Sequence, residues 1–335
     1  MPQYLGHLPL TDPLHPYLQR EILPQLGYAG GPAAFRVFRL GERDAVYLYE
    51  ERQSGLRVTG KFFAGLGQRG TPASHRAMDR EYANLHLLRT YGLVGYPHHV
   101  VRPLGRQAEL SSLLVEEYSA DPRLSQFLDA AIGQGERDML FAKLTALAYF
   151  LATLHNRTAC GVPVNFGDDG RYLDALVQDL RGQYTLDADE AQELAGLRDR
   201  WAAQPRMWAD QQVLVHGDAT PANFLLGTGL QVIAVDLERM RWADRVFDLG
   251  RIAGELQHAF LQATGDPYAA EPFIGHFLWE YACHFPDRDR AFAAIGGRLP
   301  FQMALTLLRI ARNEWVPPEQ RRRLIAEAKT TLRTY

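Results

Sequence analysis

The sequence predicts an α+β protein with a sheet-forming first third and a mainly helical remainder. Three segments rich in aromatic and β-branched residues, 35–40, 46–51 and 56–63, are separated by short turn sequences, which is typical of an antiparallel meander. From residue 121 onward the apolar residues repeat with helical spacing. A chain of 335 residues is also too long for one typical core, which favours two lobes.

Two helices are expected in the first third of the chain. Residues 16–27 are predicted to form a short helix that ends at Gly27. The second helix covers 72–91, because Thr71 is a suitable N-cap and Pro72 fits the first helical position. This helix lies between the third and fourth predicted strands, so it is expected to pack against the sheet.

Two more strands, at 99–104 and 112–118, complete a predicted five-stranded antiparallel sheet with one helix. We therefore place the first lobe at residues 1–118 and the second at 119–335. In the second lobe one apolar stripe recurs at helical spacing and predicts a core helix; its members are Leu140, Leu144, Leu147, Leu151 and Leu154. Further helices are expected at 172–202, 245–264, 272–284 and 301–313.

Composition excludes several classes of protein. The chain is 47% hydrophobic and 22% charged, as in ordinary globular proteins. A net charge of −3 without a basic stripe argues against nucleic-acid binding. No run of eighteen apolar residues predicts a transmembrane helix, and the N-terminus lacks signal-peptide features. Cys160 and Cys283 are too few for a disulfide framework, so we expect a cytoplasmic protein. The sequence does not indicate an oligomeric state.

The segment HGDATPANFLLGTGLQVIAVD, residues 216–236, carries the strongest functional signal. It places Asp218, Asn223 and Asp236 on a predicted loop, turn and strand end. Metal-assisted phosphoryl transfer needs one carboxylate to orient the attacking hydroxyl, and an amide and a second carboxylate to hold Mg²⁺. The spacings of five and thirteen residues match this arrangement. The sequence thus predicts Asp218 as the catalytic group and Asn223 and Asp236 as the metal ligands.

The motif H-G-D-x-x-P-x-N resembles the aminoglycoside phosphotransferase and choline kinase family. This resemblance implies a bilobal protein-kinase-like fold, with ATP and Mg²⁺ as cofactors and a small molecule as the phosphate acceptor. Three features depart from the protein kinases of the same fold: Asp236-Leu237-Glu238 replaces Asp-Phe-Gly, position 220 is Thr rather than Lys, and no Ala-Pro-Glu follows. The second Asp of the run DRVFDLG, Asp248, resembles the residue that braces the catalytic loop, which is a structural role.

The first lobe supplies the predicted nucleotide-binding residues. Lys61 resembles the lysine that contacts the α- and β-phosphates, and Glu81 projects from the apolar stripe of the following helix, where a carboxylate needs a cation such as Lys61. Gly41 marks a degenerate phosphate loop at 41–45; an ordinary turn is the alternative. The segment 114–121 resembles the interlobe hinge, in which the Glu117 carbonyl and the Ser119 amide bind adenine.

The acceptor is open at this stage. The resemblance implies an aminoglycoside, amino sugar, choline, homoserine or another small, possibly cationic molecule. The acidic residues of segment 160–200 form either an amine-binding wall or a solvated face; they are Asp168, Asp169, Asp187, Asp189 and Glu190. Glu238 either assists the metal or substrate or is solvated. Two alternatives in function are a nucleotide-binding regulator without turnover and a protein kinase, which the short segment after Asp236 disfavours.

Overall fold

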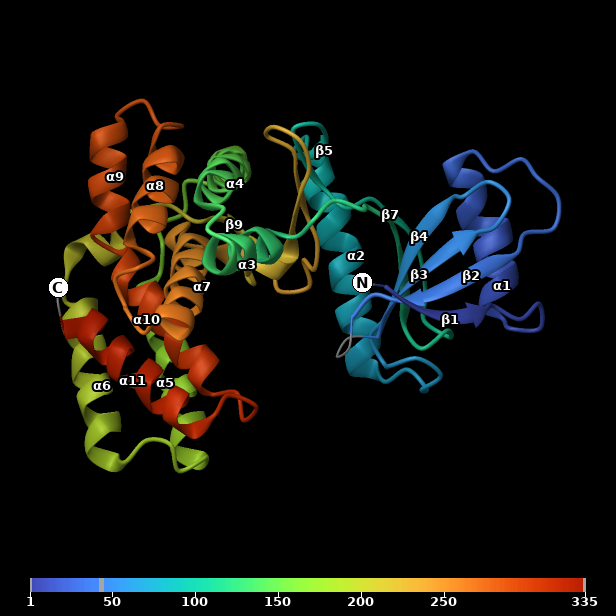
Figure 1. Ribbon diagram of the computed structural model, residues 1–335. Helices are drawn as coiled ribbons and strands as arrows, with labels where there is room; N and C mark the ends of the chain where they lie inside the picture. Colours follow the sequence, from blue (N-terminus) through green and yellow to red (C-terminus); the bar gives the residue numbers. More distant parts are fainter. Residues whose placement is uncertain (1, 42–44, 334–335) are drawn as a thin grey trace. The chain divides into compact units, whose positions relative to one another are not determined.

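The computed structural model describes residues 2–41 and 45–333 (Figure 1). The chain divides into two compact units. The first contains Met1–Asp121 together with Ile233–Glu238, and the second contains Pro122–Val232 and Arg239–Tyr335. A short segment that includes Asp236 therefore contacts the first unit although it lies far along the chain.

An antiparallel sheet dominates the first unit, with strands in the order β1-β2-β3-β4-β8-β7. Their bounds are Gln3–His7, Phe35–Arg39, Val46–Glu51, Arg57–Phe62, Leu113–Glu117 and Pro103–Gln107. The predicted meander and the mixed α+β class are confirmed. The predicted count of five strands was too low, because β1 pairs with β2 although its residues are mostly exposed and show no apolar alternation.

The predicted strand at 99–104 is two strands in the structure. β6, His98–Val100, pairs with the two-residue strand β5, Val94–Gly95, whereas β7 begins at Pro103 and joins the large sheet. Val101 donates a backbone hydrogen bond to the carbonyl of Ala234 in the strand β11, Val232–Ala234. This bond fixes the strand end from which Asp236 follows.

One face of the large sheet packs on the N-terminal helical segment: α1 (Leu14–Tyr17), a π turn (Leu18–Ile22) and a 3₁₀ turn (Leu23–Leu26). Gly27 ends this segment with a φ of 82°, as predicted for a glycine C-cap. Helix α2, Pro72–Thr90, contacts β7 and β8. The Thr71 side chain accepts a hydrogen bond from the Ser74 amide, so the predicted cap is confirmed.

Helices make up most of the second unit (Figure 1). They are α3 (Leu124–Gly133), α4 (Arg137–Thr158), α5 (Phe166–Gly182), α6 (Ala188–Ala202), α7 (Val246–Thr264), α8 (Glu271–Ala282), α9 (Arg288–Gly296), α10 (Leu299–Ala311) and α11 (Pro318–Arg333). The predicted leucine stripe is buried along α4, which confirms a core helix there. Sequence periodicity missed α3, α9 and α11, of which α9 buries only one residue along its length.

Short strands carry the motif in this unit. β9 (Val213–Val215) pairs antiparallel with β12 (Arg241–Ala243), and β10 (Phe224–Leu226) follows a 3₁₀ turn at Pro221–Asn223. Among the described residues, no single helix is long and apolar enough to cross a membrane. Helices α9 and α10, bent by 43° relative to each other, meet the length and composition criteria only as a pair.

Candidate active site

Lys61 is the centre of a charged group in the first unit. Its Nζ lies 2.6 Å from Glu81 Oε2 and 2.5 Å from Asp236 Oδ1. Strand β4 presents the lysine, and α2 presents Glu81 from its buried face, where the carboxylate is fully inaccessible to solvent. The predicted ion pair is therefore present, and it also includes a carboxylate of the motif.

Helix α2 also holds the backbone next to Asp236. Glu81 Oε1 accepts a hydrogen bond of 3.3 Å from the Leu237 amide, and Asn84 Nδ2 donates one of 2.7 Å to the Leu237 carbonyl. Asp236 itself has a φ of 64°, an uncommon conformation for a residue other than glycine. Asn84 escaped the sequence analysis, although its position three residues after Glu81 puts it on the same helix face.

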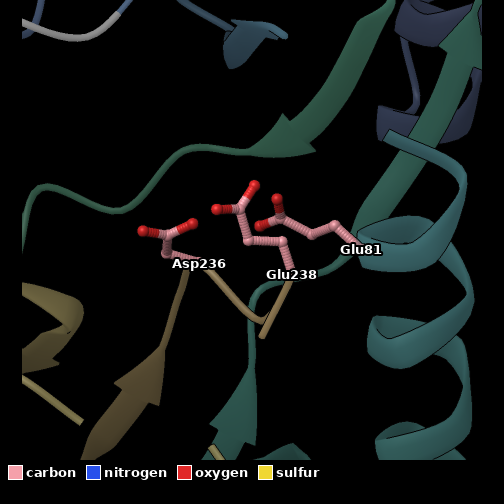
Figure 2. A group of neighbouring side chains, drawn as sticks. All are labelled: Glu81, Asp236 and Glu238. Atoms are coloured by element: carbon pink, nitrogen blue, oxygen red, sulfur yellow. The ribbon is translucent and has the colours of Figure 1, made fainter. Parts of the chain in front are cut away.

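Figure 2 shows three carboxylates side by side, Glu81, Asp236 and Glu238, whose closest oxygens all lie within 4.8 Å of one another. Burial raises the pKa of Glu81 to about 7, and Lys61 offsets part of this effect. Burial alone would lower the pKa of Lys61, but Glu81 and Asp236 outweigh it, so the ammonium stays charged. One lysine among three carboxylates leaves an excess of negative charge, and oxygen donors of this kind suit Mg²⁺.

Glu116 is a further buried carboxylate of this unit, and it was not singled out in the sequence analysis. It lies on β8 opposite Thr59 of β4, so it shares a sheet face with Lys61 and Leu114. Its side-chain atom Oε1 has no hydrogen-bond partner among the described residues. Burial raises its pKa to about 8, and the nearby charge of Glu81 adds to this effect.

The other predicted nucleotide-binding positions are also in the first unit. Glu117 ends β8, and Ser119 follows in a turn in which the Asp121 amide donates to Ser119 Oγ. Gly41 follows β2, but residues 42–44 of the predicted phosphate loop lie outside the described part of the chain. The contacts of these backbone groups with a nucleotide remain predictions.

In the second unit, β9 leads directly into the loop that carries Asp218. His216 and Gly217 donate their amides to the two carboxylate oxygens of Asp248, at 2.6 and 3.1 Å. Gly217 has a φ of 81°, and a Cβ atom there would lie 2.0 Å from the carbonyl oxygen of Arg239, so only glycine fits. The loop is thus held from both sides, and this fixes the residue that follows Gly217.

Asn223 is tied to the same loop. Its Nδ2 donates a hydrogen bond of 2.9 Å to the backbone carbonyl of Asp218, and the Thr220 amide donates one of 2.7 Å to the same carbonyl. Because the amino end of the Asn223 amide is engaged, its carbonyl oxygen is the end that a cation would meet. The predicted spacing of the motif therefore brings Asp218 and Asn223 together within this unit.

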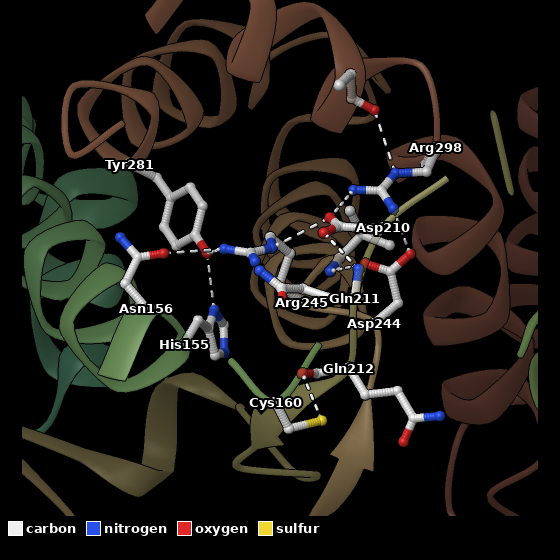
Figure 3. A network of polar contacts seen from close by, with 12 residues as sticks. His155, Asn156, Cys160, Asp210, Gln211, Gln212, Asp244, Arg245, Tyr281 and Arg298 are labelled. Atoms are coloured by element: carbon white, nitrogen blue, oxygen red, sulfur yellow. Dashed lines mark hydrogen bonds and ion pairs between the residues drawn. The ribbon is translucent and has the colours of Figure 1, made fainter. Parts of the chain in front are cut away.

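Asp248 is fully buried at the start of α7 and acts as the predicted brace. Burial opposes its ionisation, but the hydrogen bond from His155 and the charge of that ring lower its pKa below the ordinary value. His155 also contacts the hydroxyl of Tyr281 at 2.9 Å. Arg245 donates to the same hydroxyl and pairs with Asp210, which continues the network drawn in Figure 3.

The sequence analysis did not identify three further charged residues: Arg309, which lies beside Asp218, Glu255, which pairs with Arg309, and Arg251, whose charge acts on Glu255. Arg309 Nη1 of α10 lies 4.0 Å from Asp218 Oδ1, and Arg309 Nη2 donates to Glu255 of α7. Burial raises the pKa of Glu255 to about 7; Arg251 lowers it and Asp218 raises it further. Arg251 and Glu255 lie three and seven residues after Asp248, so helical spacing could have placed all three on one face of the predicted helix. No sequence pattern predicts that Arg309 of α10 lies beside Asp218.

The acidic residues of segment 160–200 have structural partners for the most part. Asp168 pairs with Arg171, and Asp187 caps α6. Glu190 lies 2.8 Å from Arg322 and also contacts Lys329. Asp169 is buried, and burial raises its pKa to about 7. The exposed Asp168 and Asp187 thus favour the solvated face over the amine-binding wall, whereas Glu190 is paired and Asp169 is buried.

Comparison with known proteins agrees with this geometry. A model of the phosphotransferase enzyme family matches residues 35–284. A search of curated proteins found no significant match. Among solved structures, a putative aminoglycoside phosphotransferase from Ralstonia eutropha is 15% identical with a TM-score of 0.57, and the alignment covers 97% of this chain and 98% of that one.

Two further solved structures share the fold. Ethanolamine kinase from Plasmodium vivax is 11% identical, with a TM-score of 0.57, and the match covers 90% of this chain and 83% of that one. A choline/ethanolamine kinase family protein from Mesorhizobium loti is 18% identical, with a TM-score of 0.55 and coverage of 96% and 94%.

The family match covers about three quarters of the chain, from β2 to the end of α8. It includes both the Lys61 group and the Asp218 loop. The chain therefore belongs to the phosphotransferase enzyme family, and it is a kinase with the bilobal protein-kinase-like fold.

Proposed function

We propose that this enzyme transfers the γ-phosphate of ATP, in the presence of Mg²⁺, to a hydroxyl group of a small molecule. The observation that carries this proposal is the position of Lys61, whose Nζ lies within 2.6 Å of both Glu81 and Asp236. A lysine oriented by a buried glutamate next to a carboxylate of the motif is the arrangement used to bind nucleotide phosphates beside a metal ion.

In this proposal the residues of the first unit bind the nucleotide. Lys61 contacts phosphate oxygens, and Glu81 holds the lysine in place. The backbone carbonyl of Glu117 and the amide of Ser119 bind adenine, and Gly41 contacts the phosphates. Mg²⁺, when bound, neutralises charge on the transferring phosphoryl group. Asp236 and Asn223 are its proposed ligands, because a carboxylate and an amide supply the oxygen donors that Mg²⁺ prefers.

Asp218 orients the acceptor. Its carboxylate accepts the proton of the acceptor hydroxyl as that oxygen bonds to the γ-phosphorus, while the bond between the γ-phosphorus and the bridging oxygen breaks and ADP leaves. Asp218 Oδ1 is buried and has no hydrogen-bond partner among the described residues, so this atom can take the hydroxyl proton. The amide bonds to Asp248 keep the loop in place during the reaction.

The resemblance and the ethanolamine kinase fold make amino alcohols and amino sugars reasonable first acceptors to test. We also propose a cytoplasmic location for the enzyme, because ATP is abundant there. If the protein is instead a regulator, it should bind ATP but release no ADP with any acceptor.

The test is ADP release with Mg²⁺-ATP across pools of amino sugars, aminoglycosides, amino alcohols, hydroxy acids and hydroxy amino acids. We expect turnover in one pool, and a loss of about 10²- to 10⁴-fold in Asp218→Ala, since this is the usual contribution of a general base. Arg312→Gln, a change at an exposed ion pair with Asp179, is the control for a surface substitution. ATP binding without turnover in any pool would instead favour the regulator.

A further inference from the structure

The second unit contains a partly enclosed cavity of about 240 Å³ that the proposed phosphate transfer does not use. Three parts of the chain line it: residues 164–172 around the start of α5, the 3₁₀ turn Pro205–Trp208, and strand β12 with Gln212, which precedes its partner strand β9. No described lining residue belongs to the Lys61 group or to the Asp218 loop. The cavity is therefore a candidate for a second binding site.

Asp169 is a buried carboxylate of this cavity without a cationic partner. Only 8% of the residue is exposed, and it forms no ion pair with a described residue. The side chain of Gln302 lies next to it, but this amide is uncharged, and its Nε2 has no hydrogen-bond partner among the described residues. Burial and the charge of Asp244 raise the pKa of Asp169 to about 7. A cation in the cavity would stabilise the ionised carboxylate.

The other two carboxylates of the cavity already have cationic partners. Asp168 pairs with Arg171, and Asp244 lies 2.7 Å from Arg298. Asp169 is therefore the carboxylate that a bound cation would meet. Within residues 2–41 and 45–333 the three carboxylates do not converge closely enough to hold a metal ion together, which favours an organic cation.

Arg241 lines the same cavity from β12. It is exposed, so it lies at the mouth of the cavity, and its guanidinium carbon is 4.2 Å from the centre of the Phe247 ring. It forms no ion pair with Asp169 or with any other described residue. A ligand with both charges fits this arrangement, with its ammonium group inside and its carboxylate at the mouth. The charge of Arg241 would oppose a simple cation.

Aromatic side chains form much of the remaining wall. Phe166 is buried, Tyr172 is half-buried, and Trp242 is 43% exposed. Aromatic rings attract an ammonium group and also pack against an apolar body. A cavity of about 240 Å³ lies below the range of about 300–1,000 Å³ that is usual for drug-sized ligands. The ligand is therefore about as large as an amino acid.

We propose that this cavity binds a small amino acid, with its ammonium group paired with Asp169 and its carboxylate with Arg241. The inference goes beyond the proposed function, because the cavity is separate from the residues assigned to ATP and to the acceptor. It is also independent of the transfer reaction, since it concerns binding alone.

Calorimetric titration of the full chain without nucleotide tests the proposal. The twenty common amino acids are first screened by melting temperature, and each one that binds is compared with two analogues, its decarboxylated amine and its deaminated acid. We expect at least one amino acid to bind, and both of its analogues to bind more weakly. If no amino acid binds, or if an analogue binds as tightly as its amino acid, the proposal is wrong.

Variants assign the two charges. Asp169→Asn keeps the shape of the side chain, and the Kd of the amino acid should rise about 10- to 100-fold, the effect of a charge-assisted hydrogen bond. Arg241→Gln should raise it less, by about 3- to 10-fold, because the contact is exposed. Asp174→Asn is the matched control: it lies on α5 and pairs with Arg198, but it does not line the cavity.

Equal affinity in the wild type, Asp169→Asn and Arg241→Gln would overturn the proposal. If Asp169→Asn does not fold, the exposed position 241 carries the test. Asp218→Ala locates the ligand, since binding should be unchanged in this variant. A loss of binding in Asp218→Ala would place the amino acid in the acceptor site and exclude the cavity. Because binding is measured without nucleotide, a failure of ADP release leaves this result unaffected.

Discussion

Lys61 and Arg309 are both cations paired with a glutamate beside a carboxylate of the motif, yet the glutamates differ in burial and the cations in hydrogen bonding: Glu81 is fully buried, whereas Glu255 is partly exposed. Lys61 contacts Glu81 and Asp236 at 2.6 and 2.5 Å. Arg309 is held by Glu255, but its Nη1 stays 4.0 Å from Asp218, and its Nε has no hydrogen-bond partner among the described residues. The first cation is therefore fixed by two short contacts with carboxylates, whereas the second has one such contact and a weaker approach to the motif.

The largest effect on stability is expected at Lys61. Lys61→Met leaves Glu81 buried without its cation, and breaking a buried ion pair costs about 3–5 kcal/mol. We therefore expect the free energy of unfolding to fall by this amount in urea denaturation, with loss of turnover. Replacing both partners, as in Lys61→Met with Glu81→Met, should recover most of the stability but not the activity. A harmless single substitution would remove the contrast between the two cations.

A smaller effect is expected at Asp248, where the backbone rather than a cation satisfies a carboxylate. Asp248→Asn removes the charge that accepts the amides of His216 and Gly217, and hydrogen bonds to charged groups contribute about 1.5–3 kcal/mol. The free energy of unfolding should fall within this range, and kcat should fall because the Asp218 loop is less firmly held. Unchanged kcat at reduced stability would show that the brace has no role in positioning Asp218.

A pH-dependent effect is expected at Glu116 in the first unit, whose Oε1 has no hydrogen-bond partner among the described residues. Its pKa of about 8 in the fold lies above the ordinary value of 4.5, so folding favours the protonated form. Its contribution to stability is present below pH 4.5 and is lost as the pH rises towards 8. Glu116→Gln should match the wild type near pH 4.5 and become the more stable of the two proteins as the pH rises towards 8. Parallel pH profiles of the two proteins would contradict this.

Local patterns made much of the first unit predictable. Strands β2, β3 and β4 follow from aromatic and β-branched runs between turns, and α2 follows from its Thr71 cap. The pair of Lys61 and Glu81 followed from a carboxylate on an apolar helix face. By contrast, β1 has exposed residues and no alternation, so it is defined by its pairing with β2 rather than by its own sequence.

In the second unit, only the site residues that lie close to one another in the sequence could be predicted. The motif spacing gave Asp218 and Asn223, and the later aspartate gave the brace at Asp248. Arg309 comes from α10, ninety-one residues after Asp218 in the sequence. Its contact with the motif depends on how α10 packs against α7, and this packing has no local sequence signal. Long-range side-chain partners of this kind are set by tertiary structure alone.

Helix α7 joins two tasks within three turns. Asp248 in its first turn holds the catalytic loop, whereas Glu255, two turns later, pairs with Arg309, whose Nη1 lies 4.0 Å from Asp218 Oδ1. Substitutions of Asp248 therefore act on the backbone of the Asp218 loop, whereas substitutions of Glu255 act on the Asp218 side chain through Arg309. A shift of this one helix would change the loop and the surroundings of its carboxylate together.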